Sequence, residues 1–321
     1  MTRTGYTSPY SPNTDADRAA MLKAIGAKSL GELFDDIPEV HRDPTLNIRP
    51  PTSELELRRE IEAMARMNAV PGDYASFLGG GAYNHHVPAV VRQIASRSEF
   101  MTAYTPYQPE VSQGTLQTHF EFQSLICQLT GMEVANAGMY DGATSLAEAC
   151  LMACRVTKRG KVMVLDTVSP SYRTVMKTFV EAPPITIHTV EPSKAEITDE
   201  YACIVVQQPS YYGTFEDVKK LAKAAHDVGA LLVVSVDLPS LGMFTPPGDY
   251  DADIVTAEGQ ALGVAPTFGG PYVGIFACKQ QYIRQMPGRI VGKTVDTKGR
   301  TGYVLTLQTR EQHIRRERAT S

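Results

Sequence analysis

Two polar residues in the second half of the chain stand where enzymes with parallel sheets carry out chemistry. Asp237 ends the short apolar run Leu231–Val236, and Gln260 follows a second such run, Ala252–Val255. Both runs are typical of buried strands. Because enzymes of this class hold their reactive groups at the carboxyl ends of strands, we expect the two side chains to lie in one site.

An acid at one strand end and a lysine near a later one are the pair by which enzymes hold pyridoxal phosphate. The acid pairs with the pyridinium nitrogen, and the lysine forms a Schiff base. Here the acid, Asp237, is present, but no lysine occurs between Lys223 and Lys279. The glutamine at position 260 cannot form an imine. The stretch therefore predicts a vestigial cofactor site that lacks its covalent anchor.

Two other interpretations were weighed against this one. A self-sufficient pyridoxal-phosphate enzyme could use a displaced lysine, Lys279 or Lys293, but Lys279 follows the next strand and comes too late for the usual topology. A nucleotide-binding protein of another doubly wound class could use the glycines at 79–81. Those glycines do not follow a strand, as that fingerprint requires. The vestigial cofactor site is the favoured interpretation.

A turn of small residues leads into a predicted helix over residues 143–153. Free amides at a helix N-terminus attract anions. Gly142, Ala143 and Thr144 are therefore candidates for binding a phosphate group in the vestigial site, although such turns also occur for packing alone. We expect weak anion binding at most, because a charged Asp237 nearby would oppose it.

The segment 102–110 combines two tyrosines and two prolines with few aliphatic residues. Stiff aromatic loops of this kind suit interfaces and binding sites. We expect the loop, with two histidines that precede it, to contribute to an active site across a subunit interface. The candidate residues are Tyr104, Thr105, Tyr107, Gln108, Glu110, His85 and His86. The alternative is that both tyrosines pack inside the subunit, and the adjacent histidines alone are not expected to bind a metal.

The pattern divides the chain into three parts. Residues 1–70 predict a tail and a helical arm, with one helix from Thr14 to near Gly26 and an amphipathic helix over 55–67. Residues 71–307 predict a large domain, in which helices alternate with strands and so imply a mostly parallel, doubly wound α/β sheet. Its end, 289–307, is expected to be a loop and a short strand. Residues 308–321 predict a charged helix that leads to a small C-terminal domain missing from this sequence.

Composition narrows the classes of partner. The 321 residues carry a net charge of −4, so no basic character points to nucleic acid. No apolar run approaches the ~18 residues of a membrane span, and the first residues lack the apolar core of a secretion signal. The five cysteines include no CxxC pair. Free thiols in a reducing compartment, and hence a cytoplasmic location, are the expectation.

Several long motifs in a fixed order carry a resemblance to one family. They are FLGGGAYNHHVP (77–88), TAYTPYQPEVSQG (102–114), YDGATSLAEA (140–149), GQALG (259–263), FGGPYVG (268–274) and RQMPGRIVG (284–292). In these motifs the chain resembles the glycine cleavage system P-protein, a glycine dehydrogenase (decarboxylating). It is most similar to subunit 1, the N-terminal-half subunit of organisms that split the enzyme into two polypeptides. The resemblance covers residues 14 to 321.

The resemblance implies a fold, a reaction and partners. The fold would be that of aminotransferase-like enzymes, pyridoxal-phosphate fold type I. Glycine would lose CO2, and its aminomethyl group would pass to the lipoyl arm of the H-protein. Pyridoxal phosphate would be bound by subunit 2, in an assembly of two copies of each subunit. Residues of this chain would line that site without anchoring the cofactor.

Overall fold

The computed structural model describes residues 10, 12–42, 44–70, 72–75, 77, 79–81, 83–101, 105–182 and 184–307. Contacts divide the chain into two compact units, Met1–Val70 and Pro71–Ser321. The charged helix predicted over 308–321 lies outside the described residues.

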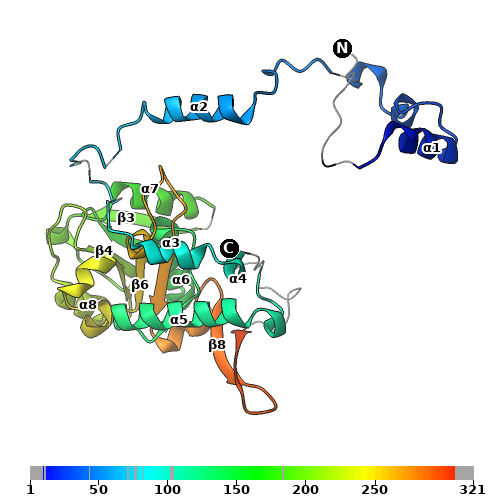
Figure 1. The fold of residues 1–321 in the computed structure, drawn as a ribbon. Coiled ribbons are helices and arrows are strands. Elements are labelled where there is room, and N and C mark those ends of the chain that lie inside the picture. The colour runs from blue at the N-terminus through cyan, green and yellow to red at the C-terminus, as the bar shows by residue number, and fades with distance from the viewer. Residues whose placement is uncertain are drawn as a thin grey trace. The chain divides into compact units, whose positions relative to one another are not determined.

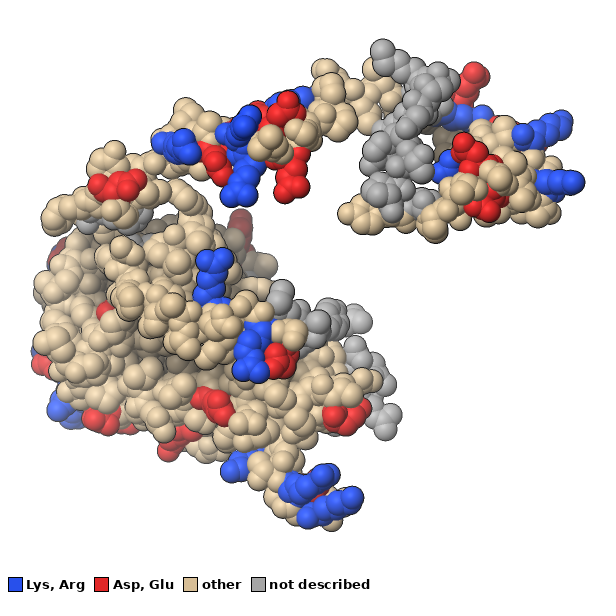
Figure 2. Space-filling view, viewed as in Figure 1, with Lys and Arg blue, Asp and Glu red and all other residues tan. Residues whose placement is uncertain are grey.

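The first unit is built from helices that bury none of their own residues. They are α1 (Asp15–Ile25), η1 (Gly31–Phe34), η2 (Glu39–His41) and α2 (Glu54–Ala65). The predicted start and end of α1 are confirmed: Thr14 and Asp17 cap it reciprocally, and Gly26 takes the left-handed conformation at its end. Basic and acidic side chains alternate along α2 (Figure 2), as in the Arg58–Glu62 ion pair at 2.9 Å.

The second unit contains the predicted sheet, with helices around it (Figure 1). Its strands lie in the order β1-β7-β6-β5-β4-β2-β3. Within this sheet β7 runs antiparallel to both of its neighbours, β1 and β6, whereas the pairs among β2 to β6 are parallel, which confirms the mostly parallel sheet. Their bounds are β1 (Val134–Ala135), β2 (Lys161–Leu165), β3 (Thr186–Val190), β4 (Tyr201–Gln208), β5 (Leu231–Val236), β6 (Ile254–Glu258) and β7 (Gly274–Cys278).

Helices cover the central strands, and most residues of those strands are buried and apolar. Every residue of β5 is buried, as expected for a parallel strand covered on both faces. α6 contacts β2 and β4 to β7, and α8 contacts β4 and β5. The helices are α3 (Ala89–Ala95), α4 (Ser98–Met101), α5 (Gln113–Thr130), α6 (Gly142–Thr157), α7 (Pro170–Phe179) and α8 (Val218–Asp227).

The expectation of a loop and one short strand over 289–307 was wrong. The segment is a two-stranded antiparallel hairpin, β8 (Ile290–Val295) paired with β9 (Thr301–Thr306). Its turn is closed by Asp296, whose carboxylate accepts hydrogen bonds from the amides of Lys298 and Arg300. Gly299 supplies the positive φ of 76° that such a turn requires.

Two glutamines of α5 hold this hairpin by imitating strand pairing. The Gln123 side chain donates to the Val291 carbonyl at 3.0 Å and accepts from the Val291 amide at 2.8 Å. Gln113 forms the same pair of bonds with Tyr303, at 2.9 and 2.8 Å. Backbone groups that would otherwise be unpaired against the helix are thereby satisfied.

Two expectations from composition can be compared with the structure. Among the residues described, no helix is both long enough and apolar enough to cross a bilayer. All five cysteines are free; Cys127 is half-buried and the other four are buried, as predicted for free thiols.

Replacing Gln123 by leucine should loosen the hairpin. The change puts an apolar side chain of similar size in a position that is 7% exposed, but it removes the side-chain partners of the amide and carbonyl of the buried Val291. We expect the free energy of unfolding in urea to fall by about 2–5 kcal/mol. Gln117→Leu on the exposed face of the same helix is the matched control and should change it by about 0.5 kcal/mol or less. Equal effects of the two changes would contradict the pairing role.

Candidate active site

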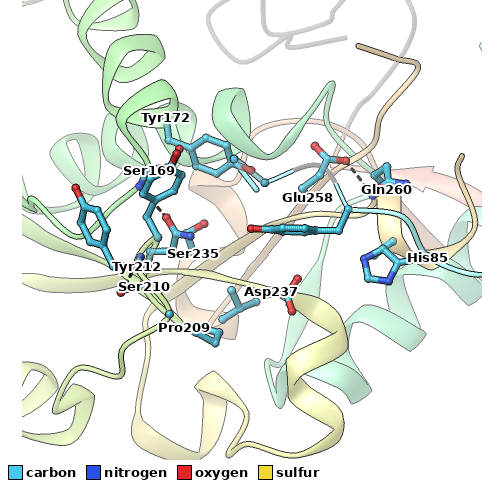
Figure 3. Close-up of a pocket in the computed structure, with 18 residues that line it drawn as sticks. His85, Ser169, Tyr172, Pro209, Ser210, Tyr212, Ser235, Asp237, Glu258 and Gln260 are labelled. Carbon is cyan, nitrogen blue, oxygen red and sulfur yellow. Dashed lines mark hydrogen bonds between the residues drawn. The ribbon is translucent and has the colours of Figure 1, made fainter. Parts of the chain in front are cut away.

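A cavity of about 500 Å³ opens at the carboxyl ends of β4, β5 and β6 (Figure 3). The end of each of these strands contributes polar side chains to its wall, and α7 and a loop that includes His85 complete it. Asp237 and Gln260, predicted from the sequence to share a site, both line this cavity. The other strand-end side chains in the wall are Gln207, Ser235 and Glu258.

Asp237 lies at the exposed mouth of the cavity. It caps the short helix η5 (Leu238–Gly242), where its carboxylate accepts a hydrogen bond from the Ser240 amide at 3.2 Å. The Ser240 hydroxyl in turn donates to the Asp237 carbonyl at 2.6 Å. The carboxylate is therefore held in place by its own turn, and its oxygens can still accept hydrogen bonds from a ligand in the cavity.

Gln260 stands where a cofactor-anchoring lysine would be expected, and its side chain is committed to its own loop. It is 3% exposed, and its amide nitrogen donates to the Val264 carbonyl. An amide nitrogen is not a nucleophile. No lysine or arginine lines the cavity within the part of the chain that the structure describes.

Glu258 is a residue of the site that the sequence analysis missed. One carboxylate oxygen accepts from the Gly142 amide at 2.9 Å, and the other accepts from the amides of Gln260 and Val273 at 3.0 and 3.3 Å. Burial raises the pKa of this carboxyl group, although the three amides act in the opposite direction. Its position at a strand end was the only available signal, since its main partner lies 116 residues away.

The start of α6 was expected to bind an anion. Two of its backbone amides instead donate hydrogen bonds to the protein's own carboxylates. The Gly142 amide donates to Glu258, and the Thr144 amide donates to the Asp141 carboxylate at 2.8 Å. The hydroxyl oxygen of Tyr172 also covers this helix end, because a Cβ on Gly142 would be only 2.5 Å from it. Gly142, Ala143 and Thr144 are not part of the cavity wall.

These residues do not fit pyridoxal phosphate. The covalent anchor is absent, two of the amides that would hold the phosphate already bind the carboxylates of Glu258 and Asp141, and the described wall has no lysine or arginine to pair with a phosphate. Carboxylates beside the phosphate would repel it. We therefore derive no step through that cofactor on this chain.

The predicted interface residues fall into two places. His85 lines the cavity, whereas the exposed His86 does not. Thr105, Tyr107, Gln108 and Glu110 lie away from the cavity wall, and Tyr104 is outside the described residues. The Tyr107 ring is half-buried beneath the Arg289 guanidinium, 5.9 Å from the ring centre. Within the described ranges, no group of three or more His, Cys, Asp or Glu side chains could hold a metal.

The raised pKa of Glu258 predicts a pH-dependent cost in stability. The ordinary pKa of this carboxyl group is 4.5, and its pKa in the folded chain is higher. Because the folded chain binds the proton more tightly than the unfolded chain, stability falls as pH rises from 4.5 toward the folded-state pKa. Glu258→Gln removes that titration while keeping an oxygen acceptor for the amides. The stability of this variant relative to the unchanged chain should therefore rise over that pH range in urea unfolding. Glu181→Gln, at an exposed position, serves as the control for loss of one carboxyl group. A pH dependence for Glu258→Gln no larger than that of this control would refute the assignment.

Comparison with known proteins shows the family to which the chain belongs. A family model described as glycine cleavage system P-protein matches residues 8–321. The chain is 51% identical to the probable glycine dehydrogenase (decarboxylating) subunit 1 of Desulforamulus reducens, over 97% of this chain and 72% of that protein. It is 52% identical to the protein of the same name from Thermomicrobium roseum, again over 97% of this chain and 72% of the relative.

Solved structures agree with the sequence matches. The crystal structure of a glycine decarboxylase (P-protein) of the glycine cleavage system, in inhibitor-bound form, aligns with a TM-score of 0.87 and 46% identity, over 98% of this chain and 72% of that one. A sphingosine-1-phosphate lyase from Burkholderia pseudomallei aligns with a TM-score of 0.55 and 13% identity, over 83% and 67%, which shows a shared fold. These likenesses confirm the predicted aminotransferase-like fold. The chain belongs to the glycine cleavage system P-protein family.

Proposed function

We propose that this chain is the non-anchoring subunit of a glycine dehydrogenase (decarboxylating), and that it completes an active site carried by a second, lysine-bearing subunit. The relatives named above support the enzyme, since both are described as subunit 1. The likeness to a P-protein structure over 98% of this chain supports the same assignment.

The observation that carries the proposal is the side chain at position 260. Gln260 is buried at the end of β6, beside Glu258, and its amide is bonded to the Val264 carbonyl. A chain with this residue at the strand end, and with no lysine between Lys223 and Lys279, cannot form the covalent link that such chemistry needs. The cofactor must therefore be held by a partner if the family's reaction is to proceed.

The partners follow from the proposed reaction. Pyridoxal phosphate, bound by the second subunit, supplies the electron sink for loss of CO2 from glycine. The aminomethyl group then passes to the lipoyl arm of the H-protein. We infer an assembly with two copies of each subunit, in which this chain positions side chains and excludes water at its partner's site.

Mixing the two subunits tests the proposal directly. This chain alone, supplied with pyridoxal phosphate, glycine and lipoylated H-protein, should release no labelled CO2. Addition of a P-protein subunit with lysine at the position of Gln260 should give a rate well above the sum of the separate rates, because only the pair holds both the anchor and a completed site. The measurement is release of labelled CO2 from carboxyl-labelled glycine.

Two controls make this result specific. A partner whose lysine is replaced by glutamine should be inactive in the mixture, whereas Gln260→Ala in this chain should leave most of the activity. Activity from this chain alone would contradict the proposal. So would a pyridoxyl adduct on one of its own lysines, found by mass analysis after borohydride reduction with pyridoxal phosphate.

The loop 105–110 is the segment that we propose to reach the partner's site. Gln108 and Glu110 are exposed, and the side chain of Val111 directly after them is 74% exposed. The base of the loop is fixed, since Gln113 donates to the Pro109 carbonyl at 2.7 Å. A loop that is already stiff loses less conformational entropy on association than a flexible one.

Substitution of Tyr107 separates a role in catalysis from a role in packing. Tyr107→Phe keeps the ring beneath Arg289 and removes one hydroxyl. We expect the rate of the reconstituted pair to fall about 10- to 100-fold, as for loss of a hydrogen bond to a charged group, while the melting temperature of this chain alone hardly moves. Tyr107→Ala also removes the ring and should lower stability by about 1–3 kcal/mol. Full activity of the Phe variant with a destabilised Ala variant would leave Tyr107 a packing residue only.

A further inference from the structure

The cavity at the strand ends has a charge that a cofactor pocket for an anion would not have. Its wall contains two carboxylates, Asp237 and Glu258, and no lysine or arginine among the residues described. Its volume of about 500 Å³ lies within the range of small-molecule sites, ~300–1,000 Å³. A cavity of this size lined by negative charge favours a cation over an anion.

The nearby helix end does not reverse this charge. The first turn of α6 gives the amide of Gly142 to Glu258, that of Thr144 to the Asp141 carboxylate and that of Ser145 to the Asp141 carbonyl at 3.0 Å. A helix N-terminus attracts anions through amides that have no other partner. With these amides engaged and Tyr172 covering Gly142, the helix offers little to a phosphate.

Buried polar side chains without partners provide a second, independent sign of a ligand. Ser235 lines the cavity and is 3% exposed, yet its hydroxyl forms no hydrogen bond to any described residue. Ser169, 5% exposed and also in the wall, likewise forms no side-chain hydrogen bond to a described residue; its backbone amide donates to the Gln207 side-chain oxygen at 2.8 Å, and its carbonyl accepts from the Arg173 amide at 3.0 Å. Gln207 and Ser235 are direct neighbours across β4 and β5. Neither serine hydroxyl is committed to a partner among the described residues, so both are free to bind a polar ligand atom in the cavity.

Aromatic rings complete the wall on the side of α7 and the loop after β4. Tyr172, Tyr211 and Tyr212 all line the cavity, and the rings of Tyr211 and Tyr212 meet edge to face at 5.4 Å. The faces of tyrosine rings attract organic cations. Figure 3 shows Tyr172, Tyr212, Asp237 and Glu258 around the same space.

We propose that this cavity is a binding site for a small organic ammonium ion that carries a hydroxyl or similar polar group. The ammonium group pairs with Asp237 near the mouth, with Glu258 and the tyrosine rings around it. The polar group hydrogen-bonds to Ser235 and the neighbouring Gln207. The site belongs to this chain alone and does not depend on the proposed role beside a partner subunit.

Titration of the purified chain with ethanolammonium tests the proposal. Near neutral pH and at constant ionic strength, calorimetry should give saturable binding with a dissociation constant of about 1–10 mM, because a ligand of four heavy atoms is too small for tight binding. Inorganic phosphate and acetate should give no saturable signal. Absence of saturable ethanolammonium binding, or binding of phosphate as strong as that of ethanolammonium, would overturn the proposal.

Variants locate the site and remain informative if one of them unfolds. Asp237→Asn, at an exposed position, should weaken ethanolammonium binding about 10- to 100-fold, whereas Asp199→Asn, an exposed carboxylate outside the cavity, should not. Ser235→Ala should remove the preference for ethanolammonium over propylammonium, which has the same number of heavy atoms but no hydroxyl. Unchanged affinity in Asp237→Asn, or equal losses in both aspartate variants, would place the ammonium elsewhere and refute the assignment.

Discussion

Glu258 is a half-buried carboxylate on which three separate segments of the large domain depend. Its oxygens accept hydrogen bonds from Gly142 at the start of α6, from Gln260 after β6 and from Val273 before β7. The approach is close: a Cβ on Gly142 would lie 2.9 Å from the Glu258 amide nitrogen, and one on Gly274 would lie 2.3 Å from the Asp141 carbonyl oxygen. Glycine at both positions lets one side chain fix the helix against two strands.

The same interactions decide which ligands the cavity can accept. A helix N-terminus carries partial positive charge, and here that charge is met inside the protein by Glu258 and Asp141. These amides already donate to the protein's own carboxylates and hold α6 in place, so an anion in the cavity cannot bind them without breaking those hydrogen bonds. What remains open to the cavity is the negative charge of Asp237 and the unpaired hydroxyl of Ser235. A helix N-terminus therefore lies at the strand ends, as in an anion site, but the charge of the cavity wall favours a cation.

The parts of the fold that could be predicted are those whose causes are local. β5 has the predicted bounds because a strand buried on both faces is a continuous apolar run. α1 begins at a capping box and ends at Gly26, and both signals lie within a few residues of the helix. The hairpin over 290–306 was missed because its strands alternate only weakly and its turn depends on Asp296 bonding to amides two and four residues on.

The candidate site was predictable in outline for the same reason. Asp237 and Gln260 were found because each comes shortly after an apolar strand, and strand order brings the ends of these strands together. Glu258 was not found, because its role arises from amides at positions 142 and 273 that only the folded sheet brings near. Spacing along the chain cannot show that the amides at a helix N-terminus already bind a carboxylate from a distant strand.

The position of Gln260 shows why this fold does not require a lysine at the end of β6. The core rests on β4, β5 and β6, whose apolar side chains pack beneath α6 and α8 whether or not a cofactor is bound. The anchor position lies beyond the last core residue of β6, and Gln260 satisfies its own amide within the loop. Replacement of a lysine there removes chemistry without opening a cavity or leaving a buried charge, the two changes that destabilise folds most. The sheet is held by the burial of its central strands and does not depend on the residue at position 260.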